Sequence, residues 1–394
     1  MEKLRRINRD VSDLVLTKLQ ARDLLQMKCV SRAWRDLISD RSFAVHHSLH
    51  GHPPLLSGFL FQEKSRWVPH KVSAVSYVST PKEEPPKLLK TPLDSIPENF
   101  AIASSCNGLI CCKSFSPLSK GASIPLSKNT SATIHVGNVL TKEWVQVDWK
   151  GPLGTAVAMG LTFDPCSDLT GSSTNFKVVM VWQTEDSDGY SFHVYSSETK
   201  SWRLSDEMCD PGWYEVYDTK CVSVKGVVYW LTDGDKILLF DVEKEMSYSV
   251  STPIPASEFD TEPVVACVGE ADGKLQYVMV SMEGLLVWGL EDLYEGKWSL
   301  EYTKSLADME KEHAEFSLNL QQVLRMQELK ERWVDPLAFR DGILMLRVSN
   351  TVFSYNTRNG GMNRVAHVTE FGTESMFDSI VVPYSLSLAP LNLP

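Results

Sequence analysis

One spacing recurs along most of this chain after residue 100. An apolar strand pattern is followed, nine residues on, by a large side chain that opens the next strand pattern. The pairs are His135 and Trp144, His193 and Trp202, Leu239 and Tyr248, and Phe353 and Met362, while Val287 and Trp298 lie slightly farther apart. A polar turn separates the two strands of each unit, which is the pattern of a β-hairpin.

Another strand pattern precedes most hairpins, and in four units it begins with a glycine: Gly108, Gly226, Gly273 and Gly342. Repeats of about 45–60 residues with three or four strands each are typical of propeller blades. A single blade cannot bury both of its faces, whereas stacked blades in a closed ring bury them and remove exposed edges. We predict a mainly β fold with six blades, seven being possible, closed by the strand pattern at 379–388.

Two further features refine this prediction. The large side chains that open the outer strands, Trp144, Trp202, Tyr248 and Trp298, are expected to pack between neighbouring blades. Residues 306–333 break the strand pattern and are rich in Met, Glu, Lys, Leu and Gln, which favour helices. We therefore predict a helical insert between two blades over 306–333.

The N-terminal residues follow a helical rather than a strand period. Apolar residues at 11, 14, 15 and 19 lie on one helix face, and Leu24 begins a second apolar cluster. Ser31 is placed to cap a third helix with the inner face Trp34, Leu37 and Ile38. Three short helices with so many leucines cannot bury all of their apolar surface alone, so the sequence predicts a small α domain that needs a partner.

The segment 14–43, and above all Cys29-Val30-Ser31-Arg32-Ala33-Trp34, resembles an F-box. The match is closest to plant proteins with a C-terminal F-box-associated domain, which Cys106-Asn107-Gly108 and Phe163-Asp164-Pro165 also resemble. The resemblance implies an F-box over 1–50 and a kelch-like, F-box-associated β-propeller over 51–394. Two positions that usually hold proline here hold Asn8 and Gln20. Because proline pre-sets the backbone entering a helix, weaker but not abolished partner docking is expected.

In that family the F-box docks on a Skp-type adaptor of a cullin–RING ubiquitin ligase, and the remaining domain selects the protein to be ubiquitinated. The resemblance thus implies a non-catalytic substrate receptor of an SCF-type ligase, with an unknown target protein. The residues expected to face the adaptor are Ile7, Val11, Leu14, Leu19, Leu24, Leu25, Val30, Trp34, Leu37 and Ile38. The sequence does not assign each of them to the core or to the interface.

Charge and composition exclude several other classes. The chain carries a net charge of −11, but residues 1–50 hold ten Lys or Arg and six Asp or Glu, a local +4, which leaves −15 for the rest. An acidic body argues against nucleic-acid binding, which needs clustered cations. No apolar run reaches the roughly 18 residues of a membrane span, and the N-terminus lacks a signal-peptide core. The eight cysteines form no C-x-x-C pair, as expected of reduced thiols in a cytoplasmic or nuclear protein.

Three alternatives remain at this stage: an F-box scaffold outside a ligase, a propeller enzyme with a helical cap, and a helix-turn-helix DNA binder. The acidic body and the Leu- and Trp-bearing third helix disfavour the last. Common catalytic motifs do not occur in the sequence. His46, His47, His50 and His52 match no zinc spacing, and Cys106, Cys111 and Cys112 are expected to be inert, so no metal or cofactor is predicted.

Overall fold

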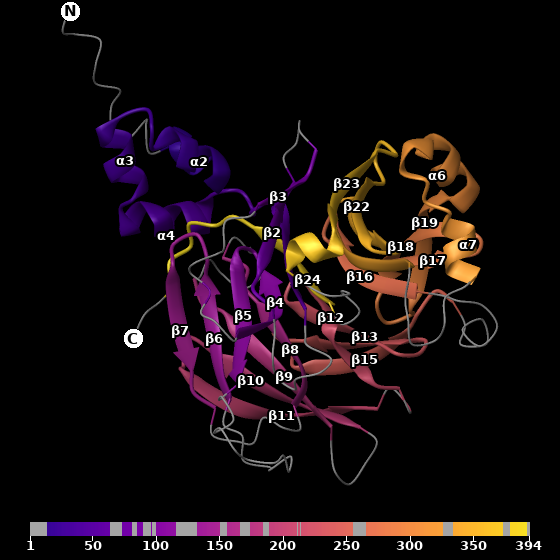
Figure 1. Ribbon diagram of the computed structural model, residues 1–394. Coiled ribbons are helices and arrows are strands. Elements are labelled where there is room, and N and C mark those ends of the chain that lie inside the picture. Colours follow the sequence, from indigo (N-terminus) through magenta and orange to yellow (C-terminus); the bar gives the residue numbers. More distant parts are fainter. Residues whose placement is uncertain are drawn as a thin grey trace, which may run out of the picture.

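The strands form a ring of six four-stranded blades around a central axis (Figure 1). This computed structural model describes residues 14–63, 73–80, 85–89, 96, 100–115, 132–149, 156–165, 174–183, 189–210, 212, 214–254, 265–325, 334–372 and 379–391. Across these residues the six blades agree with the smaller of the two blade numbers that the repeat allowed.

Each blade runs from an innermost strand at the axis to an outermost strand at the rim. Blade 1 contains β24 (Ser379–Ser385), β1 (Leu56–Glu63), β2 (Ser76–Ser79) and β3 (Lys87–Leu89). Blade 2 contains β4 (Phe100–Cys106), β5 (Leu109–Phe115), β6 (Ala132–Asn138) and β7 (Glu143–Val147). Blade 3 contains β8 (Ala156–Thr162), β9 (Lys177–Gln183), β10 (Tyr190–Ser196) and β11 (Ser201–Cys209).

The second half of the ring repeats this order. Blade 4 contains β12 (Val216–Val224), β13 (Val227–Thr232), β14 (Lys236–Asp241) and β15 (Met246–Ser251). Blade 5 contains β16 (Val265–Ala271), β17 (Lys274–Ser281), β18 (Gly284–Asp292) and β19 (Lys297–Lys304). Blade 6 contains β20 (Val334–Arg340), β21 (Ile343–Val348), β22 (Thr351–Asn356) and β23 (Met362–His367). The innermost strands of blades 5 and 6 pair in parallel over two residues, Gly269 with Phe339 and Glu270 with Arg340.

The ring is closed by strands from the two ends of the propeller. β24, near the C-terminus, pairs antiparallel with β1, with Phe59 opposite Pro383 and Leu60 opposite Val382. β24 also contacts β20 of blade 6 and β4 of blade 2. The first blade therefore needs its innermost strand from the last part of the chain, as the pattern at 379–388 predicted.

The glycines that introduce strands in the sequence lie in two-residue hairpin loops at one end of the innermost strands. The loop Asn107-Gly108 joins β4 to β5, and both residues have positive φ, 46° and 94°. Lys225-Gly226 joins β12 to β13 in the same way, with φ of 47° and 82°. Such loops need positive φ at both positions, and glycine adopts it without steric cost.

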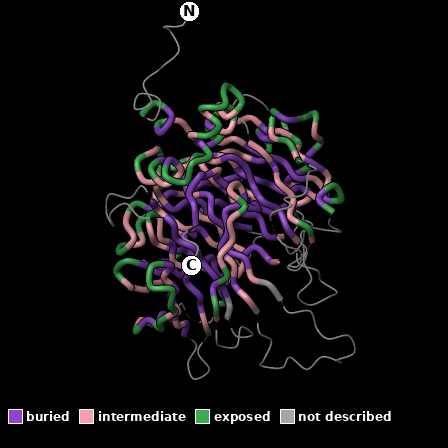
Figure 2. The backbone as a smooth tube through the Cα atoms, turned by 90° about the vertical axis from the view of Figure 1, so that its left-hand side faces the viewer, coloured by how far each residue is buried: buried purple, intermediate pink, exposed green. Residues whose placement is uncertain are grey.

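Most buried residues lie along the strands, whereas exposed residues concentrate in the connecting loops (Figure 2). The buried residues form core clusters shared by neighbouring blades. β12 contacts β4 and β24 as well as its neighbours β8 and β16, so it narrows the central channel. The Cys221 thiol of β12 lies 3.6 Å from the carbonyl oxygen of Ala103 and 3.5 Å from that of Met159. A void of about 10 Å³ remains beside Cys221. A void of this size holds at most about one water molecule, so the channel is nearly closed at that level.

Helices lie at three places in the described part of the chain. Residues 14–17 are helical and are followed by α2 (Ala21–Met27), α3 (Arg32–Ile38) and α4 (Arg41–His50), which form a unit beside blades 1 and 2 (Figure 1). Between blades 5 and 6 lie α6 (Leu306–Glu312), η1 (Ala314–Phe316) and α7 (Leu320–Arg325), and η2 (Val368–Phe371) follows β23. α6, η1 and α7 lie in the described part of the expected insert, of which 326–333 lies outside the described residues. No helix in the described ranges is long and apolar enough to cross a membrane.

Candidate functional site

Side-chain caps set the N-terminal boundaries of α3 and α4. Ser31 precedes α3, and its Oγ accepts a hydrogen bond of 3.2 Å from the backbone N–H of Trp34, as the sequence predicted. Asp40 precedes α4, and its Oδ1 accepts one of 2.8 Å from the N–H of Ser42. Each cap satisfies a backbone donor that the first helical turn leaves free. The short helices therefore begin at defined residues although none is long enough to be stable alone.

The core of this unit contains residues from all of its helices. Leu16, Ala21, Leu24, Ile38 and Phe43 are buried together. Leu24 and Ile38, two of the residues expected to face the adaptor, are at most 1% exposed. Both lie inside the unit and not on the surface that a partner could reach, because one apolar helix stripe has to serve as the internal core.

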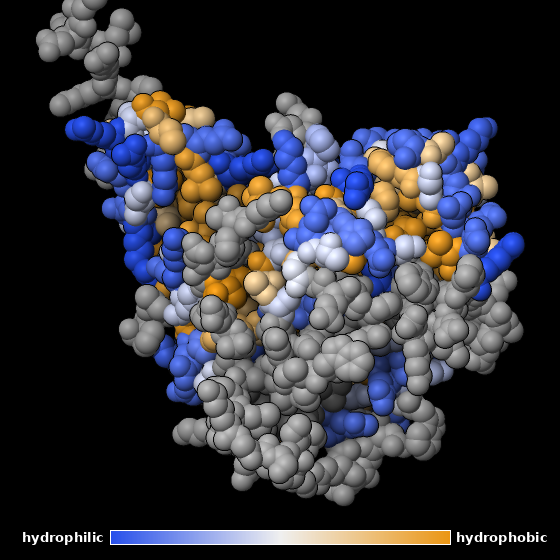
Figure 3. Space-filling model, in the orientation of Figure 1, coloured by the Kyte–Doolittle hydropathy of each residue, from blue (hydrophilic) through white to orange (hydrophobic). Residues whose placement is uncertain are grey.

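Other residues of the expected adaptor set are accessible. The side chains of Leu14 and Val30 are 65% and 62% exposed, and Val15, which the sequence analysis left out of the set, is 55% exposed. Figure 3 shows an apolar strip over this end of the molecule. Leu19, Leu25, Trp34 and Leu37 are partly buried. Ile7 and Val11 lie outside the described residues. We call Leu14, Val15 and Val30 the exposed apolar face.

The opposite side of the helical unit is covered by the segment 386–391, which follows β24. Leu388 is 4% exposed and belongs to the same core as Leu24 and Phe43, with Leu386 and Leu140 packed around it. The buried amide Nδ2 of Asn138 in blade 2 donates to the carbonyl oxygens of Ser387 and Ala389, at 3.0 and 2.8 Å. The packing of Leu388 against Leu24 and Phe43 could not be predicted from the sequence, because no local pattern in 386–391 indicates contact with residues more than 300 positions earlier.

A charged cluster completes the junction. The Arg41 guanidinium of α4 forms an ion pair with Glu143 of β7 at 3.2 Å and donates to the carbonyl oxygen of Leu391 at 2.8 Å. The other carboxylate oxygen of Glu143 accepts from the N–H of Leu391 at 2.7 Å. Hydrogen bonds to charged groups contribute more than neutral ones. These contacts hold the helical unit in a fixed orientation on blade 2.

The histidines after α3 have structural partners. His46 Nδ1 lies 3.3 Å from the Thr17 hydroxyl, and His47 Nε2 lies 2.8 Å from the carbonyl oxygen of Leu19. Burial lowers the pKa of His47, and its Nδ1 is buried with no hydrogen-bond partner among the described residues. A proton on Nδ1 would therefore be an uncompensated buried charge.

We expect acid to destabilise the helical unit through His47. Because its pKa is lowered in the folded state, the unfolded chain takes up the proton first as the pH falls below the ordinary value of 6.5. The contribution of neutral His47 to the stability of the helical unit is complete above pH 6.5. It is lost as the pH falls from 6.5 to the lower pKa of His47 in the folded state. Hydrogen exchange of the α4 amides between pH 7.5 and 5 measures this. His47→Gln should flatten the pH profile, whereas the control His50→Gln should not; equal profiles for all three proteins would contradict the expectation.

Of the three cysteines considered as reactive thiols, Cys111 and Cys112 are fully buried and Cys106 is partly buried. Cys111 and Cys112 lie on opposite faces of β5, in two different core clusters, and burial raises the pKa of Cys111 to about 12. Burial also raises the pKa of Cys106, whose thiol donates to the carbonyl oxygen of Phe163. At neutral pH these groups are protonated, and a thiol without its thiolate is a poor nucleophile.

The four aromatic residues expected between blades all lie on outermost strands. Trp202 of blade 3 donates through Nε1 to the carbonyl oxygen of Asp148, just after the outermost strand of blade 2, at 2.9 Å. Trp298 of blade 5 donates to the carbonyl oxygen of Ser251, at the end of the outermost strand of blade 4, also at 2.9 Å. Trp144 packs against the cluster shared by blades 1 and 2, and Tyr248 against the one shared by blades 4 and 5.

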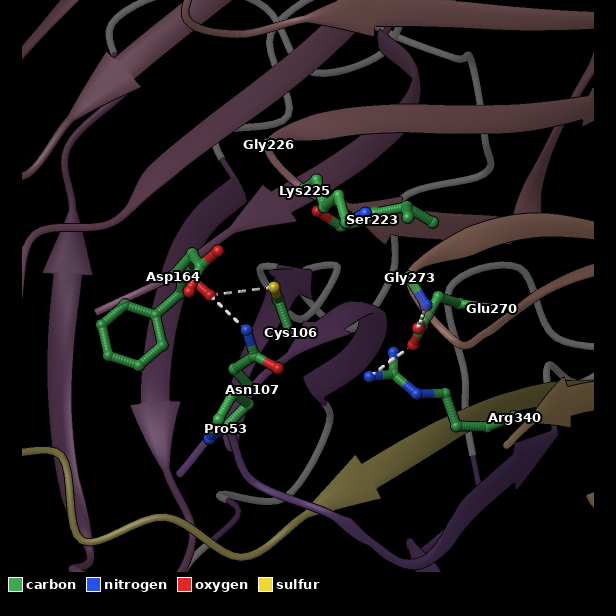
Figure 4. A pocket seen from close by; sticks show the side chains of 12 residues that line it. Pro53, Cys106, Asn107, Asp164, Ser223, Lys225, Gly226, Glu270, Gly273 and Arg340 are labelled. Atoms are coloured by element: carbon green, nitrogen blue, oxygen red, sulfur yellow. Dashed lines mark hydrogen bonds and ion pairs between the residues drawn. The ribbon is translucent and has the colours of Figure 1, made fainter. Parts of the chain in front are cut away.

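The second accessible site is a cavity of about 290 Å³ at one mouth of the ring. Its lining comes from the ends of the innermost strands of blades 2 to 6 and from Pro53 in the connection to the helical unit (Figure 4). The lining residues are Pro53, Cys106, Asn107, Phe163, Asp164, Ser223, Val224, Lys225, Gly226, Glu270, Gly273 and Arg340. The sequence analysis did not identify this site, because its residues are dispersed over almost 300 positions.

An ion pair forms one wall of the cavity. The Arg340 guanidinium points into the cavity and lies 2.5 Å from Glu270 Oε2 (Figure 4). Glu270 Oε1 accepts from the N–H of Gly273 at 2.9 Å. Burial raises the pKa of Glu270, and the neighbouring Arg340 opposes that shift. On the opposite wall, Asn107 Nδ2 donates to the carbonyl oxygen of Phe163 at 2.8 Å.

Comparison with known proteins relates the N-terminal helices and the propeller to known protein families. Residues 4–46 match the F-box domain, and residues 72–319 match the family described as F-box protein At3g26010-like, beta-propeller. Similar proteins of Arabidopsis thaliana include F-box protein At5g07610, 25% identical over 75% of this chain and 70% of that protein. F-box protein At5g49610 is 23% identical over 73% of this chain and 75% of that protein.

Solved structures give only a distant likeness. The α-L-arabinofuranosidase arb93a of Fusarium graminearum aligns over 68% of this chain and 81% of its own, with 11% identity and a TM-score of 0.37, too low a score to carry any argument about activity. The propeller profile, in contrast, spans more than half of the chain and the F-box profile spans its N-terminal helices. The chain therefore belongs to the At3g26010-like family of F-box proteins with a β-propeller.

Proposed function

We propose that this protein is the substrate-recognition subunit of an SCF-type ubiquitin ligase in the cytoplasm or nucleus. The F-box binds a Skp-type adaptor and, through it, the cullin–RING core, and the propeller holds the target protein. The observation that carries the proposal is the exposed apolar face Leu14, Val15 and Val30 on the F-box, whose other side is already packed on the propeller. Large apolar side chains left exposed on a folded unit favour a protein partner.

The mechanism that follows is proximity. A receptor that binds both adaptor and target raises the effective concentration of the target near the ubiquitin-carrying enzyme, and needs no catalytic group of its own. The thiol nearest to the mouth cavity, Cys106, is protonated and hydrogen-bonded, so the cavity wall offers no activated cysteine nucleophile.

We expect Val30→Asp to weaken adaptor binding at least thirtyfold. Val30 is 62% exposed, so an aspartate there is solvated in the free protein but would be buried in the complex at a cost of about 2 kcal/mol or more. Trp34 is less suitable for this test, because it also packs against the F-box core. Titration calorimetry of the full-length chain with a purified plant Skp-type adaptor measures the effect.

Leu204→Asp is the matched control. Leu204 lies on β11 and is 60% exposed, so the same charge enters at equal exposure but away from the F-box. It should bind the adaptor like the wild type. The proposal fails if the wild type does not bind, or if a folded Val30→Asp protein binds equally well. Addition of a cullin to the adaptor-bound chain separates the ligase subunit from a scaffold, since only the former should co-elute with it.

A further inference from the structure

The mouth cavity contains cationic groups with unused hydrogen-bonding capacity. Lys225 makes no side-chain hydrogen bond or ion pair with any described residue. Arg340 pairs with Glu270 through its Nη2, and its buried Nε lies 3.8 Å from Asp341 Oδ1, too far for a hydrogen bond, so this N–H has no hydrogen-bond partner among the described residues. Both side chains line the same cavity. A buried donor without an acceptor costs free energy, so this wall favours an acceptor supplied from outside.

Lys225 is positioned by the backbone of its neighbour. It occupies the first loop position of the β12–β13 hairpin, with a φ of 47°, where the matching loops of blades 2, 5 and 6 hold Asn107, Asp272 and Asp341. A Cβ atom added to Gly273 of blade 5 would lie only 2.9 Å from Lys225 Nζ. Glycine at 273 thus lets the ammonium group of blade 4 extend over blade 5, towards the Glu270–Arg340 pair.

The charges of the cavity wall point to an anion. The Glu270 carboxylate is occupied by Arg340 and by the N–H of Gly273, and Asp164 also has a partner within the protein. The ammonium group of Lys225 is therefore the charge left without a described counterion. The lining thus holds two carboxylates, Asp164 and Glu270, and two cations, of which only Lys225 has no described partner. A buried ion pair is a poor source of stability, which favours a binding role for the Arg340–Glu270 wall.

We propose that the mouth of the ring binds a carboxylate group of the target protein, held between Lys225 and Arg340. The shared chemistry fits an Asp or Glu side chain or the carboxyl end of a chain. A cavity of about 290 Å³ is at the lower limit of small-ligand sites, which suits one or two residues of a peptide. This inference rests on the proposed function, because it names the chemical class that the receptor would select.

A peptide selection tests the proposal. The full-length chain, bound to its adaptor, is incubated with two soluble libraries of random octapeptides, one with free C-terminal carboxylates and one with C-terminal amides. Bound peptides are identified by mass spectrometry and their affinities are measured by fluorescence anisotropy. We expect enriched peptides to carry a carboxylate. If peptides of the amide library do not bind, the site recognises the C-terminal carboxylate of a chain. If they still bind and are enriched in Asp or Glu, the site recognises a side-chain carboxylate.

Lys225→Glu and Lys200→Glu form a matched pair. Both lysines are exposed and lie at left-handed loop positions, with φ of 47° and 51°, but Lys200 does not line the cavity. We expect Lys225→Glu to weaken the enriched peptides at least tenfold and Lys200→Glu to leave them unchanged. Arg340→Gln should have at least the same effect as Lys225→Glu, provided that its thermal unfolding shows a folded protein. If Arg340→Gln does not fold, Lys225→Glu still tests the proposal, because the Lys225 side chain is exposed and makes no described ion pair.

The outcomes separate the site from the ligase role. The proposal is overturned if no carboxylate-bearing peptide is enriched, or if Lys225→Glu binds the enriched peptides as the wild type does. Adaptor binding is measured on the same samples. Intact adaptor binding without peptide binding removes only this inference, whereas peptide binding by a chain that does not bind the adaptor removes the proposed function and leaves the site.

Discussion

Trp230→Ala should lower the free energy of unfolding of the propeller by about 3–5 kcal/mol. Trp230 of β13 is fully buried between blades 3 and 4, where its ring lies 6.5 Å from that of Phe192. Its indole Nε1 has no hydrogen-bond partner in the described part of the chain. The loss therefore comes from lost burial and from the cavity left behind, and Trp230→Phe should recover much of it.

Urea unfolding followed by far-ultraviolet circular dichroism measures this loss, because tryptophan fluorescence itself changes in the variant. The matched control is Tyr294→Ala, which removes a large aromatic side chain that is 67% exposed and should cost less than about 0.5 kcal/mol. An unchanged slope with denaturant would show that both proteins unfold to the same extent. A loss below about 1 kcal/mol for Trp230→Ala would contradict the packing of blades 3 and 4 described above.

Leu388→Ala should destabilise the F-box rather than the ring. Leu388 follows the last strand of the propeller, yet it is buried in the F-box core beside Leu24 and Phe43. Truncation of a buried leucine costs about 2–5 kcal/mol, which is a large part of the stability of a unit this small. Amide hydrogen exchange of α3 and α4 should accelerate, while exchange in β13 and β14 stays unchanged. The affinity for the adaptor should fall in parallel.

Leu300→Ala provides the comparison for this experiment. Leu300 lies on β19 and is 46% exposed, so the same change in side chain removes little buried surface. It should leave exchange in the F-box as in the wild type. If Leu388→Ala also leaves the α3 and α4 amides as protected as in the wild type, then 386–391 is not part of the F-box core. The F-box would then not be held in a fixed orientation on the propeller by this segment.

Elements that depend on neighbouring residues can be predicted from the amino-acid sequence alone. Hairpin loops such as Asn107-Gly108 and the cap at Ser31 are chemical requirements met within a few positions, so a reading of the chain could find them. The blade repeat belongs to the same class, because each unit follows one alternating pattern. The closing strand was also predictable, since the pattern at 379–388 has strand character and a ring needs a strand that pairs with its first blade.

The division of the apolar residues into core and surface, in contrast, depends on tertiary contacts. Leu24 of α2 and Val30 in the turn before α3 are only six residues apart, but Leu24 is buried and Val30 is 62% exposed. Leu388 completes the F-box, and the mouth cavity unites Lys225 with Arg340 from two blades. Burial and charge pairing at these positions depend on contacts between residues far apart in the chain. Ring closure sets those contacts, and no local pattern encodes them.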